Sequence, residues 1–266
     1  MRATINGISM NYAISGPAAA PPVVLHHPLA TDLTVWDELT KALEPSYRVI
    51  RFDARGHGKT DAPKGPYDFA TLAADVTGLM DHLGIDKARY LGLSMGGFAG
   101  QVLGFTSPGR FHSLCLVSTS SDMTATPDVW NTRIATARKD GMSEGLIAGS
   151  MARWVAPAAL NSKPHVVARL SDMVRTTPVE GYIGWCEAIR DFNVTARLGD
   201  IKLPTKVIVG ALDPATSPAM AQIIHKGIAG SEYAEVPGTA HMLHVEEPEQ
   251  FHAEVLPFMA KHGPKP

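Results

Sequence analysis

The sequence predicts an α/β fold in which a mostly parallel sheet is flanked by helices and interrupted by a helical insertion. Short β-branched runs alternate with helix-length segments, and strands separated by helices need crossover connections that make neighbouring strands parallel. This alternation stops at about residue 122 and resumes at about residue 201, and the apolar spacing in between is helical. With 266 residues and 45% hydrophobic content, the chain can bury one large core. We therefore expect a core domain of residues 1–121 and 201–266, with a helical cap at 122–200.

The expected strands start with an N-terminal hairpin. Residues 3–15 alternate apolar and polar side chains around Asn6-Gly7, which is typical of a hairpin turn, so an antiparallel edge should precede the main sheet. Six further strand-like runs bring the total to eight strands: PPVVLH, YRVIRFD, ARYLGLS, SLCLVST, TKVIVG and YAEVPG. The cap is expected after the sixth strand of the eight, SLCLVST. Helical spacing predicts helices over residues 32–44, 69–83, 95–106, 217–228 and 246–261. Within the cap, we expect four helices. The residues that would break the helical pattern are Gly141, Pro157, Pro164 and Pro178.

The charge and cysteine content exclude several classes of function. The 24 Lys and Arg residues are scattered and balanced by 26 Asp and Glu residues, so no basic surface for nucleic acid is expected. The N-terminus does not resemble a signal peptide, and no run approaches the ~20 apolar residues that span a bilayer. Cys115 and Cys186 lack CxxC spacing, so we expect buried thiols rather than a disulfide or a zinc site. We therefore expect a cytoplasmic protein; its oligomeric state cannot be derived from the sequence.

The stretch ARYLGLSMGGFAGQVLG carries the strongest chemical signal. A strand-like run meets Gly92-Leu93-Ser94-Met95-Gly96 and continues as a helix, which is the context in which a G-x-S-x-G pattern forms a nucleophile turn. Small residues on either side allow the close backbone approach that such a turn needs. The following helix would place its positive N-terminal end beside the reacting centre. We therefore expect Ser94 to be a catalytic nucleophile.

A serine nucleophile needs a histidine base that a carboxylate orients. Enzymes with this type of turn supply the acid and then the base after late strands. Asp213 follows the run TKVIVG, and His241 follows YAEVPG, so we expect them to be the acid and the base. Two alternatives stay open at this point: Asp122, which follows an earlier strand, as the acid, and His244 as the base.

These motifs resemble those of the capped, cofactor-free α/β-hydrolases, and the resemblance covers essentially the whole chain. It rests on the segments RFDARGHGKTDAP, LGLSMGGFAGQ, ALDPATSP and PGTAHMLHVEEPEQF. A closer resemblance is to the 3-oxoadipate enol-lactonases of aromatic catabolism, and it rests on LATDLTVWD, GPYDF, ARWVAP and GYIGWCEAIRDFNV. This resemblance implies the α/β-hydrolase fold and no metal or organic cofactor. The chain has Trp185 and Asn193 where those lactonases usually have cysteine and aspartate, so its pocket is expected to be filled differently.

The resemblance places the segment His26-His27-Pro28 in the loop that binds the oxyanion. A metal-binding histidine pair is not expected there, because adjacent residues of an extended segment point to opposite sides and no third ligand is evident. Pro28 has no backbone N–H, which leaves His27 or Leu29 as the donor. We expect His27 to act together with Met95, so that the amide of His27 matters more than its imidazole.

Two groups of side chains in the expected cap are candidates for the substrate pocket. The aromatic candidates, which would line a small apolar cavity, are Trp154, Tyr182 and Trp185. Helical spacing would equally place them in the core of the cap. Basic residues are candidates to bind a substrate carboxylate: Arg133, Arg153 and Arg190.

The sequence therefore predicts a serine hydrolase that cleaves a small carboxylic ester or lactone through an acyl-enzyme and most resembles 3-oxoadipate enol-lactonases. One alternative is a broad-specificity carboxylesterase with perhydrolase side activity. Two others are a hydrolase of C–C bonds and a non-catalytic ligand receptor of the same fold. Dehalogenase chemistry is disfavoured, because it needs a carboxylate at position 94, where this chain has serine.

Overall fold

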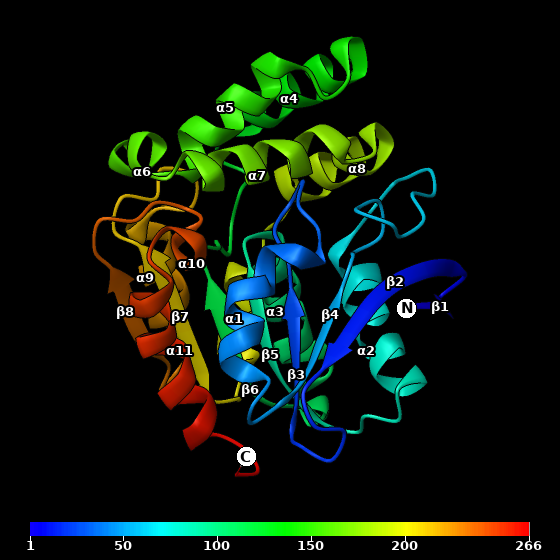
Figure 1. The fold of residues 1–266 in the computed structure, drawn as a ribbon, viewed down its shortest axis with the longest axis vertical. Helices are drawn as coiled ribbons and strands as arrows, with labels where there is room; N and C mark the ends of the chain where they lie inside the picture. Colours follow the sequence, from blue (N-terminus) through cyan, green and yellow to red (C-terminus); the bar gives the residue numbers. More distant parts are fainter. Residues whose placement is uncertain (266) are drawn as a thin grey trace.

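A central sheet is covered by helices on both faces, and a second layer of helices lies across one of its edges (Figure 1). A computed structural model describes residues 1–265. The eight strands have the order β1-β2-β4-β3-β5-β6-β7-β8; β1 pairs antiparallel with β2 and β2 with β4, and every other pair is parallel. The strands are β1 (Arg2–Ile5), β2 (Ile8–Ser15), β3 (Pro22–His26), β4 (Arg48–Phe52), β5 (Ala88–Leu93), β6 (Phe111–Val117), β7 (Thr205–Gly210) and β8 (Glu232–Val236).

The predicted N-terminal hairpin is confirmed. Strands β1 and β2 pair antiparallel with Ile5 opposite Ile8, and the turn between them has positive φ at both central residues, 46° at Asn6 and 78° at Gly7. Asparagine and glycine tolerate this left-handed conformation better than other residues, which explains why this dipeptide marks the turn. In the interior of the sheet, β5 and β7 are buried at every position, as their continuous apolar sequences require.

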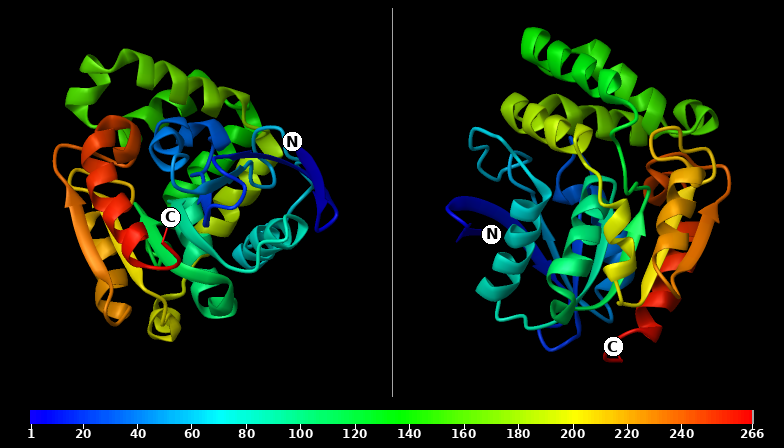
Figure 2. Two further views of the ribbon diagram at one scale, coloured as in Figure 1. Left: turned by 60° about the horizontal axis from the view of Figure 1, so that its bottom comes forward. Right: turned by 180° about the vertical axis from the view of Figure 1, so that it is seen from behind.

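Two sets of helices cover the faces of the sheet. Helices α1 (Asp37–Leu43) and α11 (Pro248–Lys261) contact each other on the face seen in Figure 1. The opposite face, seen from behind in Figure 2, carries α2 (Phe69–His82), α3 (Met95–Thr106) and α9 (Pro218–Gly227). Short helical segments complete the core: η1 (Leu33–Trp36), η2 (Pro108–Arg110), η3 (Thr195–Asp200) and α10 (Leu243–Glu246).

Five helices form the layer across the carboxyl edge of the sheet, where four were expected. They are α4 (Pro127–Asp140), α5 (Glu144–Trp154), α6 (Pro157–Ser162), α7 (Pro164–Thr176) and α8 (Val179–Arg190). All four predicted breakers lie at helix ends, and four breaks divide a segment into five pieces. The shortest of the five is the six-residue α6.

The chain leaves the sheet after β6 and returns before β7 at neighbouring points. Asp122 and Asn193 form an isolated antiparallel bridge where the two crossings meet. The helical layer therefore lies above the carboxyl ends of the parallel strands, which is where ligands bind in open α/β sheets. No helix within residues 1–265 combines the length and apolar character needed to cross a membrane.

Candidate active site

Ser94 occupies a strained turn between β5 and α3. Its backbone has φ 52° and ψ −109°, a conformation that side-chain-bearing residues rarely adopt. A Cβ atom at Gly92 would overlap the carbonyl oxygen of Gly96, and one at Gly96 would overlap that of His26. Only glycine therefore fits two residues before and two residues after Ser94. The turn presents a serine hydroxyl at the N-terminal end of a twelve-residue helix.

Asp213 and His241 come together from the loops that follow β7 and β8. His241 Nδ1 lies 2.8 Å from Asp213 Oδ2, and both side chains are buried. The other carboxylate oxygen accepts the backbone N–H groups of Ala215 at 2.8 Å and Thr216 at 3.0 Å. Burial alone would raise the pKa of Asp213, but His241 and these N–H groups outweigh it and lower the pKa below its usual value. An ionised Asp213 fixes the proton of His241 on Nδ1 and leaves Nε2 available as a base.

The two alternative residues lie elsewhere. Asp122 accepts the backbone N–H and the hydroxyl of Thr124 with one carboxylate oxygen, so it shapes the loop at the cap crossing. His244 packs its ring 4.7 Å from that of Trp36, and burial lowers its pKa to about 3. A base that is this difficult to protonate is unsuited to accept the proton of a serine.

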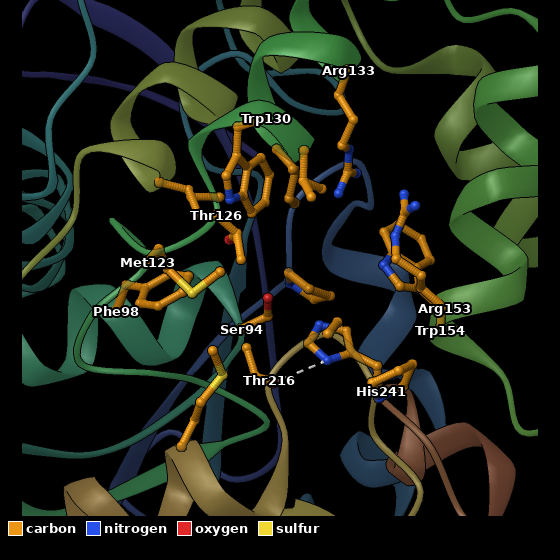
Figure 3. A pocket seen from close by; sticks show the side chains of 17 residues that line it. Ser94, Phe98, Met123, Thr126, Trp130, Arg133, Arg153, Trp154, Thr216 and His241 are labelled. Carbon is orange, nitrogen blue, oxygen red and sulfur yellow. Dashed lines mark hydrogen bonds between the residues drawn. The ribbon is translucent and has the colours of Figure 1, made fainter.

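Ser94 and His241 face one cavity beneath the helical layer (Figure 3). The cavity has a volume of about 220 Å³, which suits a small molecule. Within residues 1–265, no hydrogen bond joins Ser94 Oγ to His241, and such catalytic bonds often tighten only when substrate binds. The cavity is lined by Pro28, Leu29, Ser94, Phe98, Met123, Thr126, Val129, Trp130, Arg133, Arg153, Trp154, Ile189, Pro214, Ala215, Thr216, Met220 and His241.

The loop after β3, in which the sequence predicts the second oxyanion donor, borders the cavity. Pro28 and Leu29 line the cavity, whereas His27 does not. The His27 ring instead accepts the backbone N–H of Ala54 at 2.9 Å through Nε2 and bonds the carbonyl of Pro28 at 2.8 Å through Nδ1. Both ring nitrogens of this buried imidazole therefore form hydrogen bonds to backbone groups, one at Ala54 and one at Pro28.

A reciprocal contact joins the same two loops. His57, from the loop after β4, accepts the backbone N–H of Ala30 at 2.9 Å through Nε2. His26 bonds the Tyr90 hydroxyl at 2.7 Å, and that hydroxyl donates to the Gly96 carbonyl in the turn that holds Ser94. We call His26, His27 and His57 the loop histidines. Burial is the largest cause that lowers the pKa of each of them, which keeps them neutral. In that state His27 and His57 can accept a backbone N–H through Nε2, and His26 can donate to the Tyr90 hydroxyl through Nδ1.

Comparison with known proteins identifies the family. A family model described as the alpha/beta hydrolase fold matches residues 21–248. The chain belongs to the α/β-hydrolases. It is similar to 3-oxoadipate enol-lactonase 2 of Acinetobacter baylyi, with 33% identity over 258 residues that cover 97% of this chain and 96% of that protein.

Solved structures agree with this membership. The enol-lactonase from Burkholderia xenovorans LB400 has a TM-score of 0.95 at 36% identity and covers 98% of this chain and 100% of its own. A hydrolase from Pseudomonas aeruginosa PA01 has a TM-score of 0.93 at 36% identity and covers 97% of both chains. The predicted fold, the resemblance to enol-lactonases and the prediction of an ester-hydrolysing enzyme are confirmed by these similarities.

Two of the three aromatic residues predicted for the pocket of this α/β-hydrolase lie elsewhere. Trp185 is fully buried, donates its indole N–H to the carbonyl of Arg55 at 2.8 Å and packs against Tyr67. Tyr182 is also fully buried, and its hydroxyl accepts from Arg133 Nε at 2.8 Å. These residues are three apart on α8. Trp185 joins the cap to the core domain, and Tyr182 joins α8 to α4 within the cap. Trp154 does line the cavity.

The opposite wall of the cavity comes from α4, of which the sequence analysis named Arg133 but not Val129 or Trp130. Trp130 and Arg133 are three residues apart and line the cavity together with Val129. The Arg133 guanidinium lies 4.8 Å from the Trp130 ring centroid. The signal for these residues was present as an aromatic and a basic side chain at helical spacing, but the spacing could not show which way α4 faces.

Two of the three candidate arginines reach the cavity without a carboxylate partner among residues 1–265. Arg133 Nη2 is buried and unbonded within that range, and Arg153 forms no ion pair there. Burial and the adjacent Arg133 lower the pKa of Arg153, so the two positive charges repel each other. Arg190 instead pairs with Asp191 at 2.8 Å and does not line the cavity. The cavity of this α/β-hydrolase thus has an uncompensated positive end.

Proposed function

We propose that this α/β-hydrolase opens a small lactone that carries a carboxylate, in the manner of a 3-oxoadipate enol-lactonase, by means of Ser94, His241 and Asp213. The observation that carries this proposal is one cavity to which the core domain contributes a strained serine and a paired histidine, and the cap helices α4 and α5 contribute two arginines without a carboxylate partner among residues 1–265 (Figure 3). No metal or organic cofactor is needed for this chemistry.

In the first step, Ser94 Oγ attacks the lactone carbonyl while His241 Nε2 takes the hydroxyl proton. Asp213 remains ionised and stabilises the imidazolium that forms. The tetrahedral intermediate collapses, the ring C–O bond breaks, and His241 returns its proton to the departing enol oxygen. The acyl group is now bonded to Ser94. The enol stays attached to that acyl group, because the leaving group of a lactone is part of the same molecule.

The oxyanion of that intermediate would accept two backbone N–H groups. Met95 is the first residue of α3, where N–H groups have no intrahelical acceptor and the helix dipole favours negative charge. We assign the second donor to Leu29 rather than His27, since Leu29 lines the cavity and His27 does not. Each such donor typically contributes about 3 kcal/mol to lowering the barrier.

In the second step, water replaces the enol as the reactant. His241 takes a proton from the water, the hydroxide attacks the acyl carbonyl, and the bond to Ser94 breaks as its Oγ regains a proton from His241. The ring-opened acid and the free enzyme result.

The two arginines support a substrate with a negative charge. Adipate has two carboxyl groups, and its enol-lactone uses one of them in the ring, so one carboxylate remains for a guanidinium. Arg133 and Arg153 face the cavity without a protein carboxylate to neutralise them. Charge-assisted hydrogen bonds of this kind are roughly twice as strong as neutral ones.

A broad-specificity carboxylesterase is the second candidate, and the apolar walls of the cavity favour it. Phe98, Met123, Trp130 and Ile189 would accept an uncharged acyl chain as readily as a lactone ring. This candidate uses the same serine and differs only in how much it gains from the two arginines.

A substrate panel tests both candidates. It contains 3-oxoadipate enol-lactone, neutral lactones and p-nitrophenyl esters, with Ser94→Ala as the control. We expect the carboxylate-bearing lactone to have the highest kcat/KM and Ser94→Ala to lose turnover of every substrate. Full activity of Ser94→Ala would overturn the mechanism, and equal kcat/KM for charged and neutral substrates would favour the esterase.

A further inference from the structure

A buried carboxylate lies beside the His241 loop and takes no part in the chemistry described above. Glu246 ends α10, five residues after His241, and its side chain is shielded from solvent. Oε1 accepts the backbone N–H of Ala240 at 3.0 Å, and Oε2 accepts that of Ala156 at 2.8 Å. One carboxylate therefore bonds the residue before His241 and the segment between α5 and α6.

A backbone contact reinforces the same junction. The N–H of Met242, the residue after His241, donates to the carbonyl of Trp154 at 2.9 Å. Trp154 ends α5 and lines the cavity together with Arg153. The histidine loop is thus held to the cap on both sides of His241, next to the residues that form the positive end of the cavity.

The hydrogen bonds of Glu246 suit its ionised form, because each oxygen accepts an N–H. Burial raises its pKa, and the two N–H groups and the nearby His241 oppose that effect. Within residues 1–265, no Lys or Arg side chain pairs with this carboxylate; Lys163 bonds only the backbone carbonyl of Glu246 and the side chain of Glu247. The carboxylate of Glu246 therefore has no cationic side chain bonded to it among these residues, and Lys163, the cation bonded to its backbone carbonyl, is paired with Glu247.

We propose that Glu246 is a positioning residue that clamps the His241 loop to the cap and adds a second fixed negative charge near the imidazolium. This inference rests on the proposed function of His241. The titratable and charged groups around His241 are Asp213 from the loop after β7, His244 and Glu246 from α10, and the two cap arginines that line the same cavity, Arg133 and Arg153. His244 is neutral at working pH, so Asp213 and Glu246 supply the fixed negative charges.

Two conservative variants separate the clamp from the charge. Glu246→Gln keeps the shape but removes the charge, and its amide NH₂ would face a backbone N–H. We expect the acid limb of its kcat/KM profile to move to lower pH by about half to one unit, because the imidazolium loses a stabilising anion. Glu246→Asp keeps the charge but is too short to reach both N–H groups. We expect its acid limb to stay near that of the wild type while its kcat falls about tenfold, with a smaller change in KM.

Glu247→Gln is the matched control. Glu247 is the next residue in the chain, its side chain is 43% exposed, and its partner is Lys163. Removing its charge should leave both the acid limb and kcat unchanged. An acid limb that shifts equally in the Glu246→Gln and Glu247→Gln variants would overturn the proposal, since the effect would then be one of net charge.

A measurement without substrate keeps this inference separate from the proposed function. NMR titration of the His241 imidazole should give a lower pKa in Glu246→Gln than in the wild type, by about as much as the acid limb of the kcat/KM profile moves. An unchanged His241 titration, with only a lower melting temperature, would show that Glu246 is merely structural. Loss of all lactone and ester activity in the wild type would instead refute the proposed function, whatever the titration shows.

Discussion

Replacing His27 with alanine should destabilise the protein strongly, although the residue does not line the cavity. The substitution leaves the buried N–H of Ala54 without its acceptor, which costs about 1–3 kcal/mol. The Pro28 carbonyl keeps a partner, because the Thr31 hydroxyl also donates to it at 2.9 Å. The space left by the ring adds about 1–2 kcal/mol. The free energy of unfolding should therefore fall by about 2–5 kcal/mol in total.

Denaturant unfolding of two further variants checks the cause of this loss. His27→Gln can offer its side-chain oxygen to the Ala54 N–H and should recover a large part of the stability. His165→Ala removes an exposed histidine of α7 and should stay within about 0.5 kcal/mol of the wild type. Activity should be normalised to the folded fraction. A His27→Ala protein as stable as the wild type would refute this role of the imidazole and return attention to its amide.

Three other outcomes follow from the described contacts. Arg133→Met should lower kcat/KM for a carboxylate-bearing lactone about 10- to 100-fold and leave a neutral ester nearly unaffected, as steady-state kinetics on the matched pair would reveal. Trp185→Phe should cost about 1–3 kcal/mol in a denaturant melt without changing KM, because it removes the bond to Arg55 and part of a buried ring but no group that lines the cavity; a raised KM would put Trp185 back at the substrate. The loop histidines have pKa values below that of an unfolded histidine, so the unfolded chain binds more protons below about pH 6.5. The melting temperature should consequently fall as pH drops from 7 to 5, and a flat profile would contradict their neutral, bonded state.

Features encoded in contiguous residues could be predicted from the sequence. The strand, the G-x-S-x-G pattern and the helix around Ser94 lie within one stretch, so their joint meaning needs no knowledge of distant contacts. Asp213 and His241 could be located because each follows a strand in a mostly parallel sheet. The carboxyl ends of such strands meet at one edge, and the structure brings these two side chains within 2.8 Å.

Features that depend on distant partners could not be predicted. Helical spacing shows that Tyr182 and Trp185 share a face, but their partners lie far away in the chain. Trp185 bonds Arg55, 130 residues earlier, and Tyr182 bonds Arg133, 49 residues earlier. The choice between His27 and Leu29 depends on how the loop turns, and the positive φ of 57° at Ala30 is not evident from an alanine. The same limit hid Val129 and Trp130, which line the cavity beside the predicted Arg133.

The backbone conformation of Ser94 lowers the stability of the protein at the proposed nucleophile. A serine with φ 52° and ψ −109° costs on the order of 1–3 kcal/mol relative to a relaxed turn, a sizeable fraction of the usual stability of a domain. Glycine would relax that strain but has no hydroxyl. Selection for thermal robustness alone would therefore favour loss of the proposed nucleophile, whereas selection for the proposed activity would keep serine at this position.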